Sequence, residues 1–238
     1  RKIDYLGSQK LTMNSALIIS GWAHGIEAIK PLGDALAECF EVKLLTGAQV
    51  LRERAIPYAD FIVTGSMGGI LAMELLPTAC KKLVLLSSTA RFCAAEDYPH
   101  GTPDRILRRM IAQLKRDPAA VLNEFFKNVH YPQRESRKSI QLRNAETITE
   151  QSFQDLVDGL EYLLTSDVRE KVAAITIPIL LIHGREDRII PCGAAEWLHE
   201  HLPDSRLQLI DGGGHALAAH HFSTVVAQIR AFLHQHDA

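Results

Sequence analysis

Short apolar runs alternate with amphipathic stretches along the first ninety residues. The apolar runs lie at 16–20, 40–45, 60–64 and 82–87, and each has the length and composition of a buried strand. Between them, apolar residues recur at helical spacing over 26–40 and 69–76. Strands separated by helices are typical of βαβ units, so the pattern predicts a mostly parallel sheet flanked by helices.

The pattern changes after residue 97. Thr102-Pro103 and Asp117-Pro118 each open a stretch with helical spacing, because a capping residue before proline is a helix start signal. A further helical stretch covers 153–164, strands resume at 177–183 and 206–210, and a last helix spans 223–234. We therefore predict a core of 1–96 and 171–238 that contains the sheet, with a helical cap at 97–170. Such an insertion would cover the carboxyl ends of the strands, where ligands bind in these sheets.

Composition narrows the class of protein. The 238 residues are 47% apolar and 23% charged, which suits one soluble globular domain with an insertion. No apolar run approaches the roughly 20 residues of a membrane-spanning helix, and the first twenty residues lack the architecture of a signal peptide. The four cysteines show no paired spacing. We expect a cytoplasmic protein with reduced thiols, without disulfides and without a metal site.

Charge is spread unevenly along the chain. Residues 100–145 carry ten Lys or Arg against four Asp or Glu, a net +6, whereas the whole chain has a net charge of −2. This excess of positive charge indicates either a solvated helical face or a docking surface for an acidic partner.

The segment Thr64-Gly65-Ser66-Met67-Gly68-Gly69 lies between a predicted strand and a predicted helix. A tight turn of small residues at that place exposes a serine hydroxyl and brings helix N–H groups near it. The pattern predicts that Ser66 is a nucleophile, although the first glycine of the usual Gly-x-Ser-x-Gly is Thr64 here. The alternative is a glycine-rich turn that binds phosphate or simply reverses the chain.

A nucleophilic serine needs a base and an acid that orients the base. His215 lies on a glycine-rich loop directly after a predicted strand, and Asp187 lies five residues after another. The order Ser, Asp, His along the chain is that of α/β hydrolases and favours this pair. Less well placed alternatives remain, namely Glu186 and Asp211 for the acid and, for the base, His183, His199, His201, His220 and His221.

The tetrahedral intermediate of acyl transfer also needs hydrogen-bond donors for its oxyanion. The backbone N–H of Met67 follows the serine, and that of Trp22 lies on the loop after the first predicted strand. The Trp22 indole either walls the pocket or belongs to the core.

The chain resembles the pimeloyl-(acyl-carrier protein) methyl ester carboxylesterases of biotin synthesis, a family of α/β hydrolases. The similarity rests on Gly21-Trp22, on Gly65-Ser66-Met67-Gly68-Gly69, on Gly214-His215-Ala216 and on the tract from Gly159 to Pro191. It implies an α/β-hydrolase fold whose cap follows the sixth strand of the family's sheet. It further implies a Ser66, Asp187 and His215 triad, oxyanion and substrate contacts by Trp22 and Met67, a substrate contact by Phe125, and no cofactor. Basic cap residues of the family bind acidic acyl carrier protein, which assigns docking to Arg137, Lys138 and Arg143.

Several positions depart from the family pattern. Ser20 replaces a histidine, Gly65 replaces a tryptophan, and Ala120 and Glu124 stand where basic residues are expected. Segment 46–60 is shorter than usual. A short-chain carboxylesterase or thioesterase, a carbon–carbon bond hydrolase and a non-catalytic ligand-binding member of the fold therefore remain alternatives.

Overall fold

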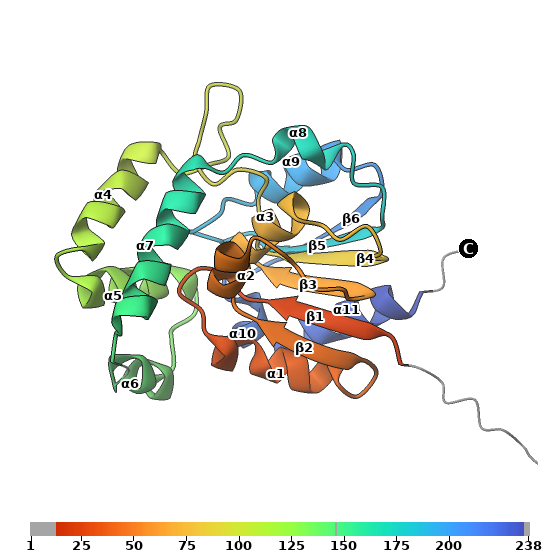
Figure 1. Cartoon of the computed structure of the whole chain (residues 1–238), viewed down its shortest axis with the longest axis horizontal. Helices are drawn as coiled ribbons and strands as arrows, with labels where there is room; N and C mark the ends of the chain where they lie inside the picture. The colour runs from red at the N-terminus through yellow and green to blue at the C-terminus, as the bar shows by residue number, and fades with distance from the viewer. Residues whose placement is uncertain (1–12, 146, 236–238) are drawn as a thin grey trace, which may run out of the picture.

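The computed structural model describes residues 13–145 and 147–235 and contains one sheet of six parallel strands. The sheet order is β2-β1-β3-β4-β5-β6 (Figure 1). The strands are β1 (Ser15–Ile19), β2 (Glu41–Leu45), β3 (Phe61–Gly65), β4 (Lys82–Leu86), β5 (Ile179–Gly184) and β6 (Ser205–Ile210). Because all strands run the same way, their carboxyl ends and the loops that follow them meet at one edge of the sheet.

Side chains of alternating strand residues enter two separate hydrophobic cores. In β1, Leu17 and Ile19 belong to one core, whereas Ala16 and Ile18 belong to the other. The strands are apolar throughout because each face of the sheet is covered.

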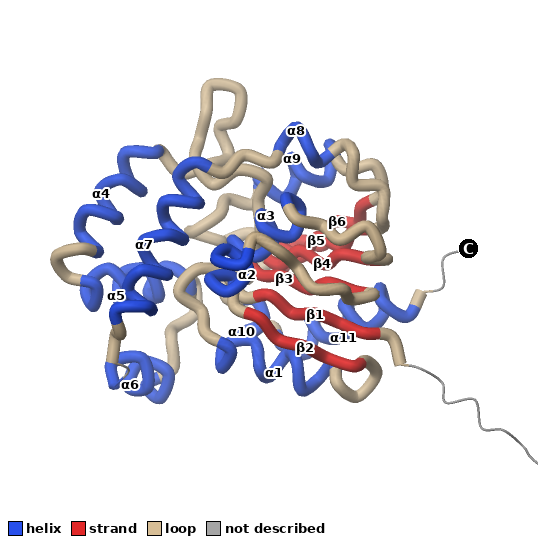
Figure 2. The backbone as a smooth tube through the Cα atoms, in the orientation of Figure 1, coloured by secondary structure: helices blue, strands red, loops and turns tan. Residues whose placement is uncertain are grey.

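Helices cover both faces of the sheet (Figure 2). One face packs against α1 (Ile26–Leu36) and α11 (Phe222–His234), with α10 (Leu217–His220) beside them. The other face packs against α2 (Gly47–Glu53), α3 (Met67–Glu74), α8 (Arg169–Val172) and α9 (Gly193–His201).

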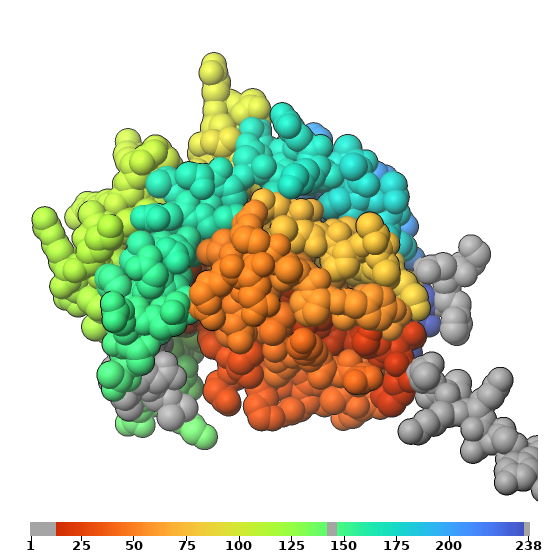
Figure 3. Space-filling view, viewed as in Figure 1, coloured from red at the N-terminus to blue at the C-terminus, as the bar shows by residue number. Residues whose placement is uncertain are grey.

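A block of four helices lies beyond one end of the sheet, between β4 and β5 in sequence (Figure 1). They are α4 (Asp104–Leu114), α5 (Pro118–Val129), α6 (Arg137–Ala145) and α7 (Glu150–Thr165). Helix α7 packs on α4 and also contacts α2, which covers the sheet. Helices α7 and α2 form a continuous surface (Figure 3). Within the described residues, no helix has the length and apolar character needed to cross a membrane.

The predicted strands all occur, each within two residues of its predicted bounds. The predicted helix at 26–40 ends at Leu36, and the next residues turn so that Phe40 packs into the core. The prediction missed α2, which begins with a capping box in which Thr46 and Gln49 satisfy each other's backbone N–H groups. The helix predicted at 69–76 begins earlier, at Met67, directly after Ser66.

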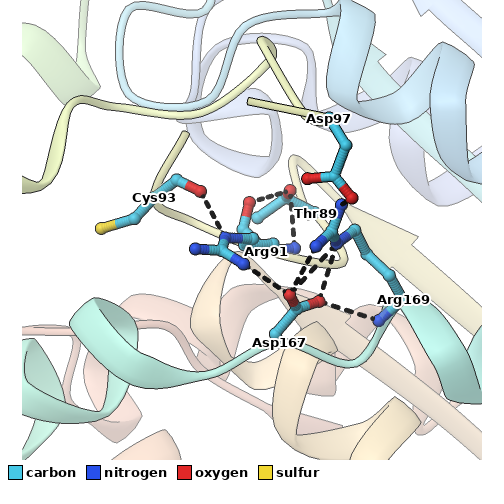
Figure 4. Close-up of polar contacts among 6 residues, drawn as sticks. All are labelled: Thr89, Arg91, Cys93, Asp97, Asp167 and Arg169. Carbon is cyan, nitrogen blue, oxygen red and sulfur yellow. Dashed lines mark hydrogen bonds and ion pairs between the residues drawn. The ribbon is translucent and has the colours of Figure 1, made fainter. Parts of the chain in front are cut away.

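The two chain segments that join the helical block to the sheet are held together by an ion cluster (Figure 4). The Asp167 carboxylate accepts hydrogen bonds from Arg91 Nη1 at 2.6 Å and from Arg169 Nη2 at 2.8 Å. Arg169 also pairs with Asp97 at 2.8 Å, and Arg91 donates from Nε to the Cys93 carbonyl. Burial works to raise the pKa of Asp167, but the hydrogen bonds of Arg169 and Arg91 hold it below its ordinary value. One carboxylate therefore joins the segment that enters the block to the segment that leaves it.

We predict that Asp167→Ala lowers the free energy of unfolding by about 1.5–3 kcal/mol, the usual range for charge-assisted hydrogen bonds. Asp104→Ala is the control, because Asp104 pairs with Arg108 on the exposed face of α4 and its loss should cost below about 1 kcal/mol. Urea unfolding of both variants measures the difference. Equal losses would show that the cluster does not stabilise the junction.

Candidate active site

Ser66 lies at the turn between β3 and α3 with a backbone φ of 52° and ψ of −120°. L-residues rarely adopt this conformation, which costs free energy of about 1–3 kcal/mol and persists where the surrounding structure imposes it. Ser66 N donates to the Leu86 carbonyl, and Ser88 Oγ donates to the Ser66 carbonyl at 2.9 Å. The turn presents Ser66 to a cavity of about 940 Å³.

Asp187 and His215 come from different loops at the same sheet edge and are hydrogen-bonded. His215 Nδ1 lies 2.7 Å from Asp187 Oδ2, and both side chains are almost fully buried. The other carboxylate oxygen, Oδ1, accepts from the backbone N–H groups of Ile189 at 2.8 Å and Ile190 at 2.9 Å. Asp187 therefore holds the imidazole with Nδ1 toward the carboxylate and leaves Nε2 as the remaining ring nitrogen.

His183 is a second partner of Asp187. Its Nε2 lies 3.3 Å from Asp187 Oδ2 and 2.9 Å from the Ile190 carbonyl, and its side chain is buried. Burial works to raise the pKa of Asp187, but the charge and hydrogen bonds of His215 and His183 hold that pKa well below its ordinary value. The carboxylate is thus charged at neutral pH.

The other sequence candidates lie elsewhere. Asp211 is exposed and pairs with Arg185 at 2.7 Å. Among the described residues, Glu186 forms no hydrogen bond with His215, whose partner is Asp187. His199 and His201 bond to Ser205 and Trp197, and His220 bonds to His130 at 2.8 Å. His221 bonds the Gly212 carbonyl at 3.4 Å. Of these candidates, the structure pairs only His215 and His183 with Asp187.

Two consecutive residues after β4 link the Ser66 turn to the His215 loop. Ser88 holds the Ser66 carbonyl, while Ser87 Oγ donates to the His215 carbonyl at 3.1 Å. No hydrogen bond joins Ser66 Oγ to His215 in the part of the chain that the structure describes. Catalytic hydrogen bonds are often long before substrate binds, so the arrangement keeps both residues as partners.

The loop after β1 lies directly against Ser66. A Cβ added at Gly21 would lie 3.0 Å from Ser66 Cβ and 3.6 Å from its Oγ. Trp22 follows, and Ser20 holds this loop by donating to the His24 carbonyl at 2.6 Å and accepting from Gly47 N at 3.3 Å. Ser20 thus serves a structural purpose at the position where a histidine was expected.

Trp22, Met67 and Phe125 occupy different places around the cavity. Trp22 lines it, packs edge-on against Phe125 with ring centroids 4.7 Å apart, and donates from Nε1 to the Leu156 carbonyl at 2.9 Å. Phe125 also lines the cavity. The Met67 side chain is buried away from it, but Met67 begins α3, so its N–H has no acceptor inside the helix. Backbone N–H groups of Met67 and Trp22 therefore remain the oxyanion candidates, whereas a side-chain contact of Met67 with substrate has no support in the cavity lining.

His183, Ser87 and Ser88 support the site but were not predicted from the sequence to do so. His183 lies near the end of β5, four residues before Asp187. This spacing is a local signal that the two side chains can meet. The serines had no comparable signal, because their partners are backbone carbonyls remote in sequence.

The predicted docking residues lie on α6. Arg137 and Lys138 are exposed, Arg143 belongs to the same helix, and its side chain lies outside the described atoms. Across the described chain, no group of three or more His, Cys, Asp or Glu side chains is arranged to hold a metal ion.

The chain is similar in sequence to a known protein family and to several esterases. The profile of a family described as serine aminopeptidase, S33, matches residues 44–220. The pimeloyl-(acyl-carrier protein) methyl ester esterase of Nitrosomonas europaea is 37% identical over 176 residues, which cover 71% of this chain and 68% of that protein. The esterase of the same name from Neisseria meningitidis is 32% identical over 208 residues, 84% of this chain and 79% of the relative.

Solved structures give the same fold. An esterase from Exiguobacterium antarcticum superposes with a TM-score of 0.80 at 18% identity, covering 94% of each chain. A bromoperoxidase from Bacillus anthracis superposes with a TM-score of 0.78 at 21% identity, covering 93% of this chain and 92% of its own. The predicted α/β-hydrolase fold is therefore confirmed.

The His215 loop also touches the helical block, and this contact yields a prediction. A Cβ at Gly214 would lie 1.6 Å from the Tyr131 carbonyl oxygen, so Gly214→Ala must displace the loop or the block. We expect a loss of unfolding free energy of about 1–3 kcal/mol, the usual cost of overpacking. Gly65→Ala is the control, because its Cβ would meet nothing within 4 Å. A Gly214 variant as stable as the control would contradict the contact.

Proposed function

Because this chain belongs to the serine aminopeptidase S33 family and to the family of the pimeloyl-(acyl-carrier protein) methyl ester esterases, we propose that it is a serine carboxylesterase whose substrate is a pimeloyl-(acyl-carrier protein) methyl ester. The observation that carries the proposal is the His215–Asp187 pair at 2.7 Å, at the sheet edge where Ser66 faces a large cavity. That combination supplies a nucleophile, a base and a fixed acid around a space for substrate.

The proposed reaction has two steps. Ser66 Oγ attacks the ester carbonyl carbon while His215 Nε2 takes the hydroxyl proton, and the oxyanion is bound by the N–H groups of Trp22 and Met67. The intermediate then expels methanol, which receives the proton from His215. A water molecule, deprotonated by His215, attacks the acyl-enzyme, and the second tetrahedral intermediate releases the free acid as His215 returns the proton to Ser66 Oγ. Side chains and backbone amides complete these steps without a metal or cofactor.

The charge on Asp187 supports the proton transfers. An imidazolium forms transiently on His215, and a buried carboxylate 2.7 Å away stabilises it and keeps the ring in one orientation. His183 pairs with the same carboxylate oxygen as His215, and two backbone N–H groups hold the other oxygen.

The helical block is proposed to act as a cap, with the boundaries 97–170 predicted from the sequence and the core formed by 1–96 and 171–238. Two contacts support the role. The Leu156 carbonyl of α7 holds the Trp22 indole, and Phe125 of α5 packs on the same ring, so the block forms one wall of the cavity. The four free thiols support a cytoplasmic location, because reducing compartments keep cysteines unpaired.

An acidic acyl carrier protein is the proposed partner, with Arg137, Lys138 and Arg143 of α6 as its docking residues. Arg137 and Lys138 are exposed, and residues 100–145 carry a net charge of +6. A surface of one sign attracts an oppositely charged protein and raises the rate of encounter.

Asp187→Asn should lower the turnover of p-nitrophenyl butyrate by about 10⁴, because the amide favours the wrong tautomer of His215. Asp211→Asn and Glu186→Gln are the matched controls, since among the described residues neither carboxylate forms a hydrogen bond or ion pair with His215. Steady-state kinetics of the three variants measure the difference. If either control were the more damaged variant, the assignment of the acid would be wrong.

Docking predicts a salt dependence that a free ester lacks. The kcat/KM for the carrier-bound ester should fall steeply with salt, because the Debye length shrinks from about 10 Å at 0.1 M to about 3 Å at 1 M. The triple reversal of Arg137, Lys138 and Arg143 to Glu should impair that substrate and spare free pimeloyl methyl ester. Lys43→Glu, on the edge strand β2, is the control.

Equal loss on both substrates would mean that the reversal damaged the cap. No loss on either would remove α6 as a docking site. A wild-type enzyme that hydrolyses the free ester as well as the carrier-bound one would instead be a general short-chain carboxylesterase.

A further inference from the structure

The cavity that contains Ser66 is apolar inside and has cations where it opens to solvent. Its walls include Trp22, Phe125, Leu160 and Leu163. Arg105, Arg109 and Arg188 also line it, and all three are exposed residues. A residue that lines a cavity and is also exposed lies near its opening, so these three arginines lie at the entrance.

The arginines come from two elements. Arg105 and Arg109 are four residues apart on α4 and therefore project from one face of that helix. Arg188 follows Asp187 on the loop after β5, and its guanidinium stacks 3.1 Å over the Tyr131 ring. This stacking holds the Arg188 side chain beside the helical block.

Among the described residues, no acid forms an ion pair with Arg105, Arg109 or Arg188. Neither Arg105 nor Arg109 has an ion pair or hydrogen bond within the described residues, whereas their neighbour Arg108 pairs with Asp104 at 3.2 Å. Glu124 is the single acid among the lining residues. It is engaged on its own helix by Lys127 at 3.4 Å and Asn128 at 3.2 Å. The entrance therefore has a local excess of positive charge.

We propose that Arg105, Arg109 and Arg188 bind a negatively charged group at the end of the substrate remote from the ester. This inference rests on the proposed ester hydrolysis at Ser66. An apolar chain occupies the cavity from Ser66 outward, and a carboxylate or phosphate at its far end meets the guanidinium groups. Arginine suits either anion, because its planar fork donates two parallel hydrogen bonds. The anion is either the substrate's own carboxylate or a group carried by an attached protein, and the two sources are separable by experiment.

The positions of these arginines can be compared with Ala120 and Glu124, two residues that depart from the family pattern. Both residues line the same cavity on α5, where basic residues are expected. In this chain the cations of the entrance lie on α4 and on the loop after β5 instead.

The test compares the monomethyl and dimethyl esters of one dicarboxylic acid, which differ in a single charge at the far end. The measured quantity is the ratio of kcat/KM for the monoester to that for the diester. Arg105→Gln/Arg109→Gln and Arg188→Gln should each lower that ratio, by about tenfold for the double variant, through a higher KM for the monoester. Arg108→Gln is the matched control, since it lies on the same helix outside the cavity lining.

The possible results separate the sources of the anion. A lower ratio places the anion on the free acid. In a second outcome, the ratio stays unchanged while the arginine variants lose activity on the carrier-bound ester and Arg108→Gln does not. That result places the anion on the carrier-borne substrate. Equal loss on all esters, or no loss on any, would overturn the proposal. A wild-type protein inactive on the neutral diester and on p-nitrophenyl butyrate would refute the esterase function itself.

Discussion

A charged carboxylate without exposed side-chain surface has to be paired on every side, and Asp187 satisfies this requirement in the candidate site. Two backbone N–H groups hold one oxygen, and His215 and His183 hold the other. The backbone donors fix the loop after β5, and His215 fixes the loop after β6. The orientation of His215, the proposed base, therefore depends on this buried anion.

The remaining contacts bring the Ser66 turn and the helical block to that anion. Ser87 and Ser88 connect the His215 loop with the Ser66 turn. Tyr131 of the helical block lies against Gly214, and Ala216 N donates to the Val129 carbonyl at 3.1 Å. Asp167 joins the two segments that connect the block to the sheet. A displacement of the block would thus reach His215 as well as the walls of the cavity.

The sequence predicted the features that local pattern determines. Strands buried on both faces are short apolar runs, and the tight turn at Ser66 requires small residues, so both were recognisable. Helix α2 was missed although Thr46 and Gln49 form a capping box, because the segment is short and carries a weak apolar pattern. The pairing of His183 with Asp187 and the contact of Tyr131 with Gly214 depend on tertiary packing. Spacing along the chain does not determine such contacts.

The central claim is that Ser66 is a nucleophile activated by the His215–Asp187 pair. The most direct measurement is reaction with a fluorophosphonate probe, followed by peptide mass spectrometry to locate the adduct. The account predicts one adduct, on Ser66, formed more slowly in Asp187→Asn and absent in Ser66→Ala. An adduct on a neighbouring serine such as Ser88, or a folded wild-type protein that does not react, would contradict it.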